Sequence, residues 1–327
     1  MKARECEFYS DGVRLDGLLQ LPDVPPANER GYPAVVFCSG YQGLKELIPE
    51  KFWNALTAAG IACFSFDYRG FGTSDGDRGR LLPSEQVEDA LNGVTYLLEQ
   101  PEIDASRVAL VGWGFGGGVV VQAAAEDERV AAVACLSGIG DGGRAVRDSR
   151  TYPEWLAMQD RIKADRVRRV LTGEAERVSP WDIVPLEPVT RADVDREMYA
   201  KHDRFGIEMY LYSADAYYRF QPEKVADKIS PRPLLIMHGT RNGLHPIDEA
   251  RSLYAHAAEP KVLVELPDAT HLDWIEVGHP LHAEAMQVLT SWLQEALPHS
   301  GHEQLAVSAA EQADASVLRA VPSTAGN

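Results

Sequence analysis

Six short, nearly continuous apolar runs are the feature of this sequence that most restricts how the chain can fold. The runs cover residues 34–38, 61–66, 108–111, 130–135, 234–237 and 262–265. Runs of this kind are typical of parallel strands that helices bury on both faces. Helix-length segments separate several of them, at residues 49–59, 85–99 and 116–126. This alternation predicts βαβ units and a mostly parallel sheet.

An antiparallel hairpin is expected ahead of these runs. Two strand-like segments, residues 6–9 and 13–20, flank the pair Asp11-Gly12, which favours a tight turn. Together with the six runs, they predict an α/β sheet of eight strands with helices on both faces, in which the second strand is antiparallel.

The composition excludes several classes of partner. The chain has 327 residues, with 49 acidic and 32 basic side chains and a net charge of −17, the wrong sign for binding nucleic acid or anionic lipid. No apolar run approaches the roughly 20 residues that span a bilayer, and the first ten residues lack the apolar segment of a signal peptide. Four cysteines without CxxC spacing predict neither a disulfide framework nor a zinc site. We therefore expect a cytoplasmic protein that uses no metal ion and no cofactor.

The alternation of strand and helix breaks between about residues 142 and 218, which predicts an insertion. This segment is rich in charged residues but also in aromatic ones. We predict that residues 1–141 and 219–298 form the core, while 142–218 form a helical cap over an apolar or aromatic small molecule. The alternative is a second packing layer without a ligand. Residues 299–327, with few large apolar side chains, are predicted to be a disordered tail.

Residues 107–118, RVALVGWGFGGG, predict a tight turn between a strand and a helix. In the nucleophile elbow, G-x-S-x-G, such a turn holds a catalytic serine in a strained conformation. Gly112 and Gly116 occupy the flanking positions, where strand and helix approach too closely for a Cβ. At the centre, where a serine is expected, the chain has Gly114. A phosphate-binding loop is disfavoured because the chain lacks GxxxxGK[ST].

Four further motifs accompany this turn. They are FCSGYQG at 37–43, DYRGFGTSDG at 67–76, LIMHGTRNGLHP at 235–246 and PDATHLDW at 267–274. In this order, the five motifs resemble the α/β-hydrolase superfamily over about residues 5–297, in particular capped bacterial esterases, acyl hydrolases and peptidase-like members. The resemblance implies an α/β-hydrolase fold, with an eight-stranded, mostly parallel sheet, helices on both faces and a helical cap.

The resemblance also implies where catalytic residues should stand. The family triad follows the chain order Ser, Asp or Glu, His, and these positions hold Gly114, Asn242 and His271. Gly114 cannot form an acyl-enzyme, and Asn242 has no charge to stabilise a protonated His271. We therefore expect no ordinary acyl-serine hydrolysis.

His271 is the candidate general base or acid. Asn242 could orient it as a neutral hydrogen-bond acceptor, or could simply cap its own loop. Asp141 stands at the second position where this superfamily keeps its acid, although an aspartate between glycines also favours a turn. The resemblance places the oxyanion hole at the backbone amides of Tyr41 and Phe115. His271 would then activate water directly.

These residues favour an enzyme that acts on a small carbonyl compound, at an ester, amide, lactone or C–C bond. The chemistry would be hydrolytic or of a lyase, cyclase or oxygenase type, with oxyanion amides and His271 and without a cofactor. Two alternatives stay open: a catalytically silent binding protein of hydrolase descent, and a serine hydrolase inactivated by a substitution at Gly114. The expected ligand is an apolar or aromatic small molecule, and a homodimer is left open.

Overall fold

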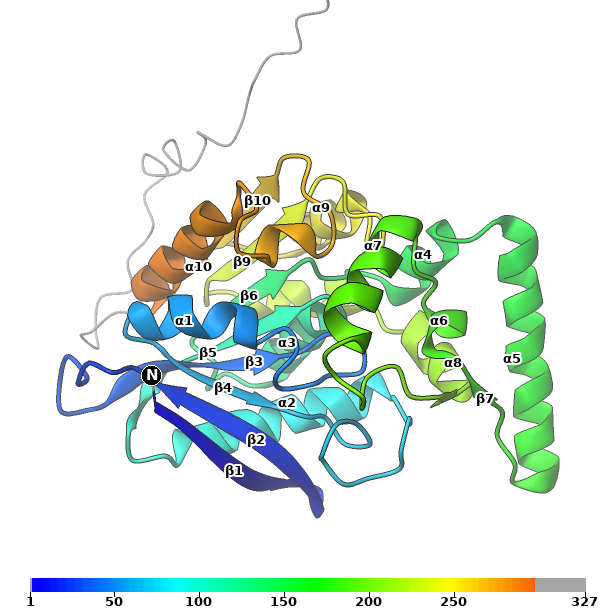
Figure 1. The fold of residues 1–327 in the computed structure, drawn as a ribbon, viewed down its shortest axis with the longest axis horizontal. Coiled ribbons are helices and arrows are strands. Elements are labelled where there is room, and N and C mark those ends of the chain that lie inside the picture. The colour runs from blue at the N-terminus through cyan, green and yellow to red at the C-terminus, as the bar shows by residue number, and fades with distance from the viewer. Residues whose placement is uncertain (1, 298–327) are drawn as a thin grey trace, which may run out of the picture.

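The apolar runs form the central sheet of the computed structural model, which describes residues 2–297 (Figure 1). Its strands are β1 (Lys2–Ser10), β2 (Val13–Leu21), β3 (Tyr32–Cys38), β4 (Ala62–Phe66), β5 (Ile103–Trp113), β6 (Ala132–Leu136), β9 (Leu234–Gly239) and β10 (Lys261–Leu266). Their spatial order is β1-β2-β4-β3-β5-β6-β9-β10. β2 pairs antiparallel with β1 and β4, and the remaining pairs are parallel. The prediction of eight strands with an antiparallel second strand is confirmed.

Helices cover both faces of the sheet, because each inner strand sends alternate side chains to opposite sides. In β3, Val36 and Cys38 join one apolar cluster, whereas Val35 and Phe37 join another. The covering helices are α1 (Glu50–Ala58) and α10 (His282–Ala296) on the second cluster, and α2 (Pro83–Leu98), α3 (Phe115–Glu126) and α9 (Ile247–His256) on the first. The helices predicted in the first half of the chain correspond to α1, α2 and α3. Two short 3₁₀ helices, η2 (Pro222–Ile229) and η3 (Asp273–Ile275), connect later elements.

Residues 142–218, called the cap segment below, form helices and a small two-stranded sheet (Figure 1). Its elements are α4 (Gly142–Asp148), α5 (Tyr152–Thr172), β7 (Arg177–Val178), α6 (Pro180–Ile183), α7 (Pro188–Asp193), the π-helix η1 (Val194–Tyr199), β8 (Met209–Tyr210) and α8 (Tyr212–Tyr218). A capping box of Thr151 and Glu154 begins α5, and Gly173 ends it in a left-handed conformation. This long helix therefore carries strong start and stop signals of its own.

An ion-pair cluster ties the cap segment to the core. The guanidinium of Arg144, in α4, lies 2.8 Å from the carboxylate of Glu223 and 2.6 Å from that of Glu249. Both carboxylates are buried, and a buried charge is costly unless it is paired. The cluster therefore fixes the start of the cap segment against η2 and α9.

Two sequence-based expectations concern other parts of the chain. The predicted tail, residues 299–327, lies outside the described residues. Within residues 2–297, no helix combines the length and apolar character needed to cross a membrane.

Candidate active site

Gly114 stands in the sharp turn between β5 and α3, in a conformation that few side chains adopt. Its φ is +56° and its ψ is −122°, and its amide donates to the carbonyl of Leu136 over 2.9 Å. A Cβ built at this position would lie 3.6 Å from His271 Nε2 and 3.7 Å from His245 Cε1. The turn therefore has the shape of a nucleophile elbow whose side chain would face two histidines.

Close backbone packing requires the flanking glycines. A Cβ on Gly112 would come within 3.0 Å of the carbonyl oxygen of Gly116, and a Cβ on Gly116 would come as close to the carbonyl oxygen of Ser39. Real Cβ atoms essentially never approach backbone atoms so closely. The interpretation of Gly112 and Gly116 as positions without room for a Cβ is confirmed.

Gly116→Ala is expected to lower the free energy of unfolding by about 3 kcal/mol or more, because the clashing atoms are backbone and cannot turn aside. Urea titration of the purified variant measures the loss. Gly173→Ala is the control: its Cβ would meet no atom of residues 2–297 within 4 Å, so only its left-handed backbone costs energy, about 1 kcal/mol. Equal losses in the two variants would contradict the steric explanation.

A pocket lies over the turn, between the core and the cap segment. It contains about 570 Å³ of empty space, including the part open to solvent. Tyr41, Gly114, Phe115 and His271 all line it, so the structure brings these four predicted site residues together. The cap segment contributes a mainly apolar wall made of Trp181, Val184, Leu186, Thr190, Val194, Met198, Phe205 and Tyr217. Such a lining suits an apolar or aromatic ligand with few polar groups.

Tyr41, in the loop after β3, and Phe115, the first residue of α3, meet beside the turn. A Cβ built on Gly40 would lie 3.9 Å from the amide nitrogen of Phe115, which places that loop against the start of α3. The rings of Tyr41 and Phe115 both contact Tyr217 of the cap segment, with ring centroids 5.8 and 4.7 Å away. The two residues therefore stand together at the pocket wall, beside the position that a nucleophile would occupy.

His271 is buried in the loop after β10. Its ring contacts those of Trp113 and His245, at centroid separations of 5.6 and 5.0 Å. Its Nδ1 atom is buried and has no hydrogen-bond partner within the described part of the chain. Burial, with smaller contributions from His245 and His238, lowers the pKa of His271 well below its usual value. The imidazole is therefore neutral at pH 7 and can accept a proton, as a general base must.

Asn242 does not orient His271. Its Oδ1 accepts hydrogen bonds from the backbone amides of His245 and Leu244, at 2.9 and 3.2 Å. Its side-chain nitrogen lies 3.1 Å from Nε2 of His238. These contacts are those of a side chain that caps its own loop, the second role considered for Asn242, because the short loop after β9 folds back on its side chain.

Asp141 is not among the residues that line the pocket with His271. It is the N-cap of α4, where its side chain accepts a 3.0 Å hydrogen bond from the backbone amide of Arg144. Its second carboxylate oxygen accepts from the side chain of Gln221 at 2.6 Å. These bonds are those of a helix cap, a local structural role.

Sequence reasoning missed His245, which also lines the pocket. Its Nδ1 donates to the carbonyl of Ser137 over 2.8 Å, and its own carbonyl accepts from His238 Nε2 over 2.7 Å. Burial lowers the pKa of both His238 and His245 to about 4. The sequence carried no signal for this arrangement, because Ser137 is 108 residues from His245 along the chain. Among residues 2–297, no group of three or more His, Cys, Asp or Glu residues is placed to hold a metal ion.

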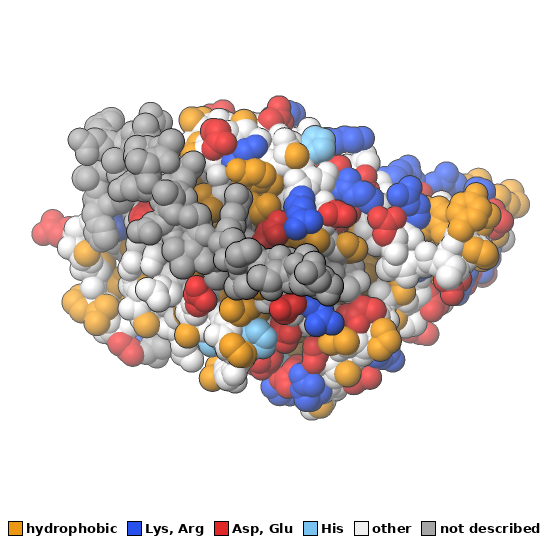
Figure 2. Space-filling model, turned by 90° about the horizontal axis from the view of Figure 1, so that it is seen from above, with side chains coloured by type: hydrophobic (Ala, Val, Ile, Leu, Met, Phe, Trp, Pro, Cys, Tyr) orange, Lys and Arg blue, Asp and Glu red, His pale blue; other side chains and the backbone are white. Residues whose placement is uncertain are grey.

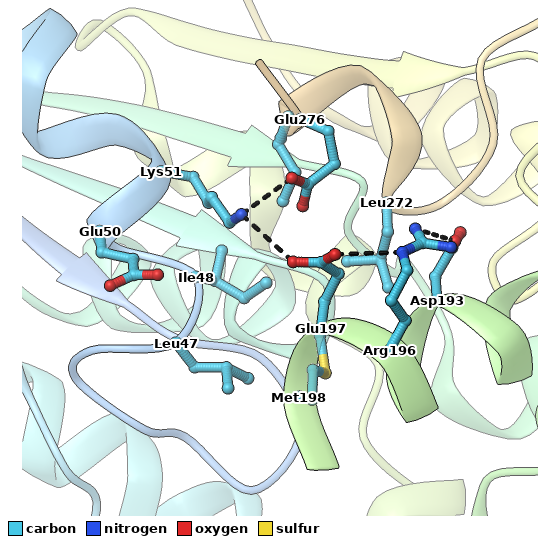
Figure 3. Close-up of a pocket in the computed structure, with 11 residues that line it drawn as sticks. Leu47, Ile48, Glu50, Lys51, Asp193, Arg196, Glu197, Met198, Leu272 and Glu276 are labelled. Atoms are coloured by element: carbon cyan, nitrogen blue, oxygen red, sulfur yellow. Dashed lines mark hydrogen bonds and ion pairs between the residues drawn. The ribbon is translucent and has the colours of Figure 1, made fainter. Parts of the chain in front are cut away.

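A smaller pocket adjoins the first and shares four apolar lining residues with it (Figure 3): Leu47, Ile48, Met198 and Leu272. Lys51 of α1 reaches into it, with its Nζ 2.9 Å from Glu276 and 3.7 Å from Glu197 of η1 (Figure 3). These ion pairs link the cap segment with two parts of the core, and so hold η1 in place beside the larger pocket.

Comparisons with known proteins agree with this architecture. A family model described as "Serine aminopeptidase, S33" matches residues 32–277. An Escherichia coli relative, "Uncharacterized 31.7 kDa protein in traX-finO intergenic region", is 30% identical and aligns over 84% of this chain and 94% of its own. The polyketide transferase grgF of Penicillium sp is 31% identical, over 83% of this chain and 90% of its own.

Solved structures show the same fold. Hypothetical protein PA2218 from Pseudomonas aeruginosa superimposes with a TM-score of 0.78 and 24% identity, covering 90% of this chain and 94% of that one. The α/β hydrolase GrgF from Penicillium sp. sh18 gives a TM-score of 0.72 and 23% identity, covering 91% and 99%. The α/β-hydrolase fold expected from the five motifs is confirmed. With its strand order, its turn at Gly114 and the family match over most of its core, the chain belongs to the serine aminopeptidase (S33) family of α/β hydrolases.

Proposed function

We propose that this protein is an enzyme that acts on a small, mainly apolar carbonyl compound without forming an acyl-serine. One observation carries the proposal: a neutral, buried His271 faces the space over Gly114, inside a pocket with an apolar wall. Relatives described as polyketide transferases and as a thiohydrolase, aneE of Aspergillus aculeatus, support a carbonyl substrate class.

In a hydrolytic reaction, water would occupy the space over Gly114. His271 Nε2 would take a proton from this water as its oxygen bonds to the carbonyl carbon. The backbone amides of Tyr41 and Phe115 would stabilise the negative charge that develops on the carbonyl oxygen. The protonated His271 would then give its proton to the departing oxygen, sulfur or nitrogen, so that atoms and charge balance.

His245 belongs to the same proposal as a second hydrogen-bond acceptor. Its Nδ1 is used in the bond to Ser137, which leaves Nε2 as the acceptor nitrogen of a neutral ring. The Cε1 atom of its ring lies 3.7 Å from the Cβ position of Gly114, and the ring of His271 lies 3.6 Å from it. A water molecule there would be held from two sides, with one proton directed at each imidazole.

His271→Ala is expected to lower kcat by about 10²–10⁴-fold, the usual contribution of a general base, with little change in ligand affinity. Turnover of activated esters, thioesters and lactones measures kcat, and quenching of tryptophan fluorescence measures binding. At pH values below 6.5 at which the parent is still folded, its rate should stay high, because the lowered pKa of His271 keeps the imidazole neutral there. The control is His256→Ala at an exposed histidine. Full activity in His271→Ala would exclude this mechanism.

One observation favours a second candidate function, a binding protein without catalysis. Among residues 2–297, the Nδ1 atom of His271 has no hydrogen-bond partner, so no hydrogen bond at this atom would stabilise the protonated ring. The same assays separate the two functions. Saturable binding of an apolar carbonyl compound without turnover in the parent, unchanged in His271→Ala, would support the binding protein.

A further inference from the structure

The outer side of α5 carries an apolar stripe. Five large hydrophobic side chains of this helix are exposed to solvent: Tyr152, Leu156, Val167, Val170 and Leu171. Val170 and Leu171 keep 79% and 77% of their surface exposed. At about 100° per residue, these five side chains fall within a sector roughly 100° wide. α5 lies at the outer edge of the molecule (Figure 1), and hydrophobic side chains gather at that end of the surface (Figure 2).

The stripe is separate from the face with which α5 packs on its own protein. That inner face buries Met158, Ile162 and Asp165, while the exposed stripe lies on the opposite side of the helix. A surface helix ordinarily has one apolar face and one polar face. A second apolar face, on the solvent side, therefore indicates a partner.

Two opposite charges interrupt the middle of the stripe. The Oδ1 atom of Asp160 lies 3.1 Å from Nζ of Lys163, and the two side chains are 76% and 74% exposed. They divide the stripe into an N-terminal apolar half, with Tyr152 and Leu156, and a C-terminal apolar half, with Val167, Val170 and Leu171. Along α5 the order is therefore apolar half, negative charge, positive charge, apolar half. Followed from the C-terminal end, the order of apolar and charged positions is the same, but the positive charge comes first.

We propose that α5 pairs antiparallel with α5 of a second copy of this chain, and so forms a two-fold homodimer. When Asp160 faces Lys163 of the second copy, Leu156 falls opposite Val167, because the two helices run in opposite directions. The same register sets Tyr152 and Pro153 opposite Leu171 and Val170. Every apolar residue then meets an apolar residue and every charge meets its opposite, as a self-complementary interface requires.

The observations favour a second copy over a different partner. The pattern complements itself in both charge and hydrophobicity, and a partner of another sequence would not require that. The helix has 21 residues, about 30 Å of contact length, and paired helices approach to about 8–10 Å. None of the stripe residues lines either of the two pockets described above, so this dimer does not depend on the proposed function.

Exchanging the charges tests the register directly. Asp160→Lys sets a lysine opposite Lys163 of the second copy at both contacts, and Lys163→Asp sets an aspartate opposite Asp160 at both, so each variant alone is expected to be monomeric. An equimolar mixture of the two variants restores opposite charges at both contacts and is expected to dimerise. The double variant Asp160→Lys/Lys163→Asp is also expected to dimerise. Sedimentation velocity from low to high micromolar concentration gives the oligomeric state of each sample.

An apolar substitution tests the stripe itself. Val167→Glu is expected to weaken the dimer at least tenfold without changing the melting temperature of the monomer. Val24→Glu is the matched control, since Val24 and Val167 are both 58% exposed. The control should dimerise like the parent.

Three results would overturn the dimer. The first is a full-length parent that stays monomeric at every concentration. The second is a dimer that Val167→Glu leaves intact. The third is a monomer that binds phosphatidylcholine–phosphatidylserine vesicles and loses this binding in Val167→Glu, which would assign the stripe to a membrane surface.

Discussion

Gly114→Ser is expected to give this protein acyl-ester turnover about 10²–10⁴-fold above the parent. A Cβ at position 114 lies 3.6 Å from His271 Nε2, so a hydroxyl one bond further out can reach hydrogen-bond distance. The φ of +56° already has the strained geometry that an elbow imposes on its nucleophile. A burst of product from p-nitrophenyl esters, followed by slower turnover, would report the acyl-enzyme.

Two further variants make this result specific. Gly114→Ala adds the Cβ without the hydroxyl and is expected to show no turnover. Adding Asn242→Asp to Gly114→Ser is expected to change the rate less than about tenfold, because residue 242 faces His238 and its own loop rather than His271. An orienting carboxylate on a catalytic histidine contributes roughly 10⁴ in a serine protease. A gain of that size from Asn242→Asp would contradict the placement of this side chain.

If Gly114→Ser turns esters over and the parent does not, the protein is a serine hydrolase scaffold whose nucleophile is missing. If neither turns over, the pocket serves a different reaction or binding alone. In that case, lactones, thioesters and carbon–carbon cleavage substrates are the next to assay.

Acid is expected to destabilise this protein strongly between about pH 6.5 and pH 4. His238 and His245 have pKa values near 4 in the folded chain, and a histidine in an unfolded chain titrates near 6.5. The unfolded chain therefore binds protons in this range that the folded chain does not, and the stability present above pH 6.5 is lost as the pH falls. Each of these histidines contributes about 3 kcal/mol, and His271 adds to the loss in the same direction.

Buried carboxylates oppose part of this loss. Burial raises the pKa of Asp67, Asp89 and Glu249, so the folded chain takes up protons at these groups as the pH falls. His238→Gln isolates the contribution of one histidine, because it removes one titrating group. The slope of the unfolding free energy against pH should then become shallower by up to about 1.4 kcal/mol per pH unit. Urea titrations at several pH values measure this slope. An unchanged slope in His238→Gln, or an equal change in the exposed control His256→Gln, would contradict the explanation.

The sheet and the turn could be predicted from the sequence because their causes are local. A strand buried on both faces needs a continuous apolar run, and six such runs mark six of the eight strands. The turn at Gly114 needs glycines at fixed positions, because backbone atoms of β5, α3 and the loop after β3 approach too closely for a Cβ. The candidate base could be found for the same reason, since His271 follows the last strand within a recognisable motif.

The partners of that base depended on contacts between distant parts of the chain. Asn242 stands where the sequence resemblance led us to expect the acid, but its side chain makes its hydrogen bonds within its own loop and contacts His238, with none to His271. His245 comes to the pocket through a carbonyl at Ser137, in a different loop.

The sequence by itself thus determined the sheet, the glycine turn after β5 and the position of His271 after the last strand, because apolar periodicity, a glycine pattern and a motif are all local properties. Only the tertiary structure decided which side chains meet that histidine, which residues wall the pocket and which side of α5 is left exposed. These depend on how the cap segment and the strand-end loops pack together, and packing between distant segments leaves no periodic trace in the chain.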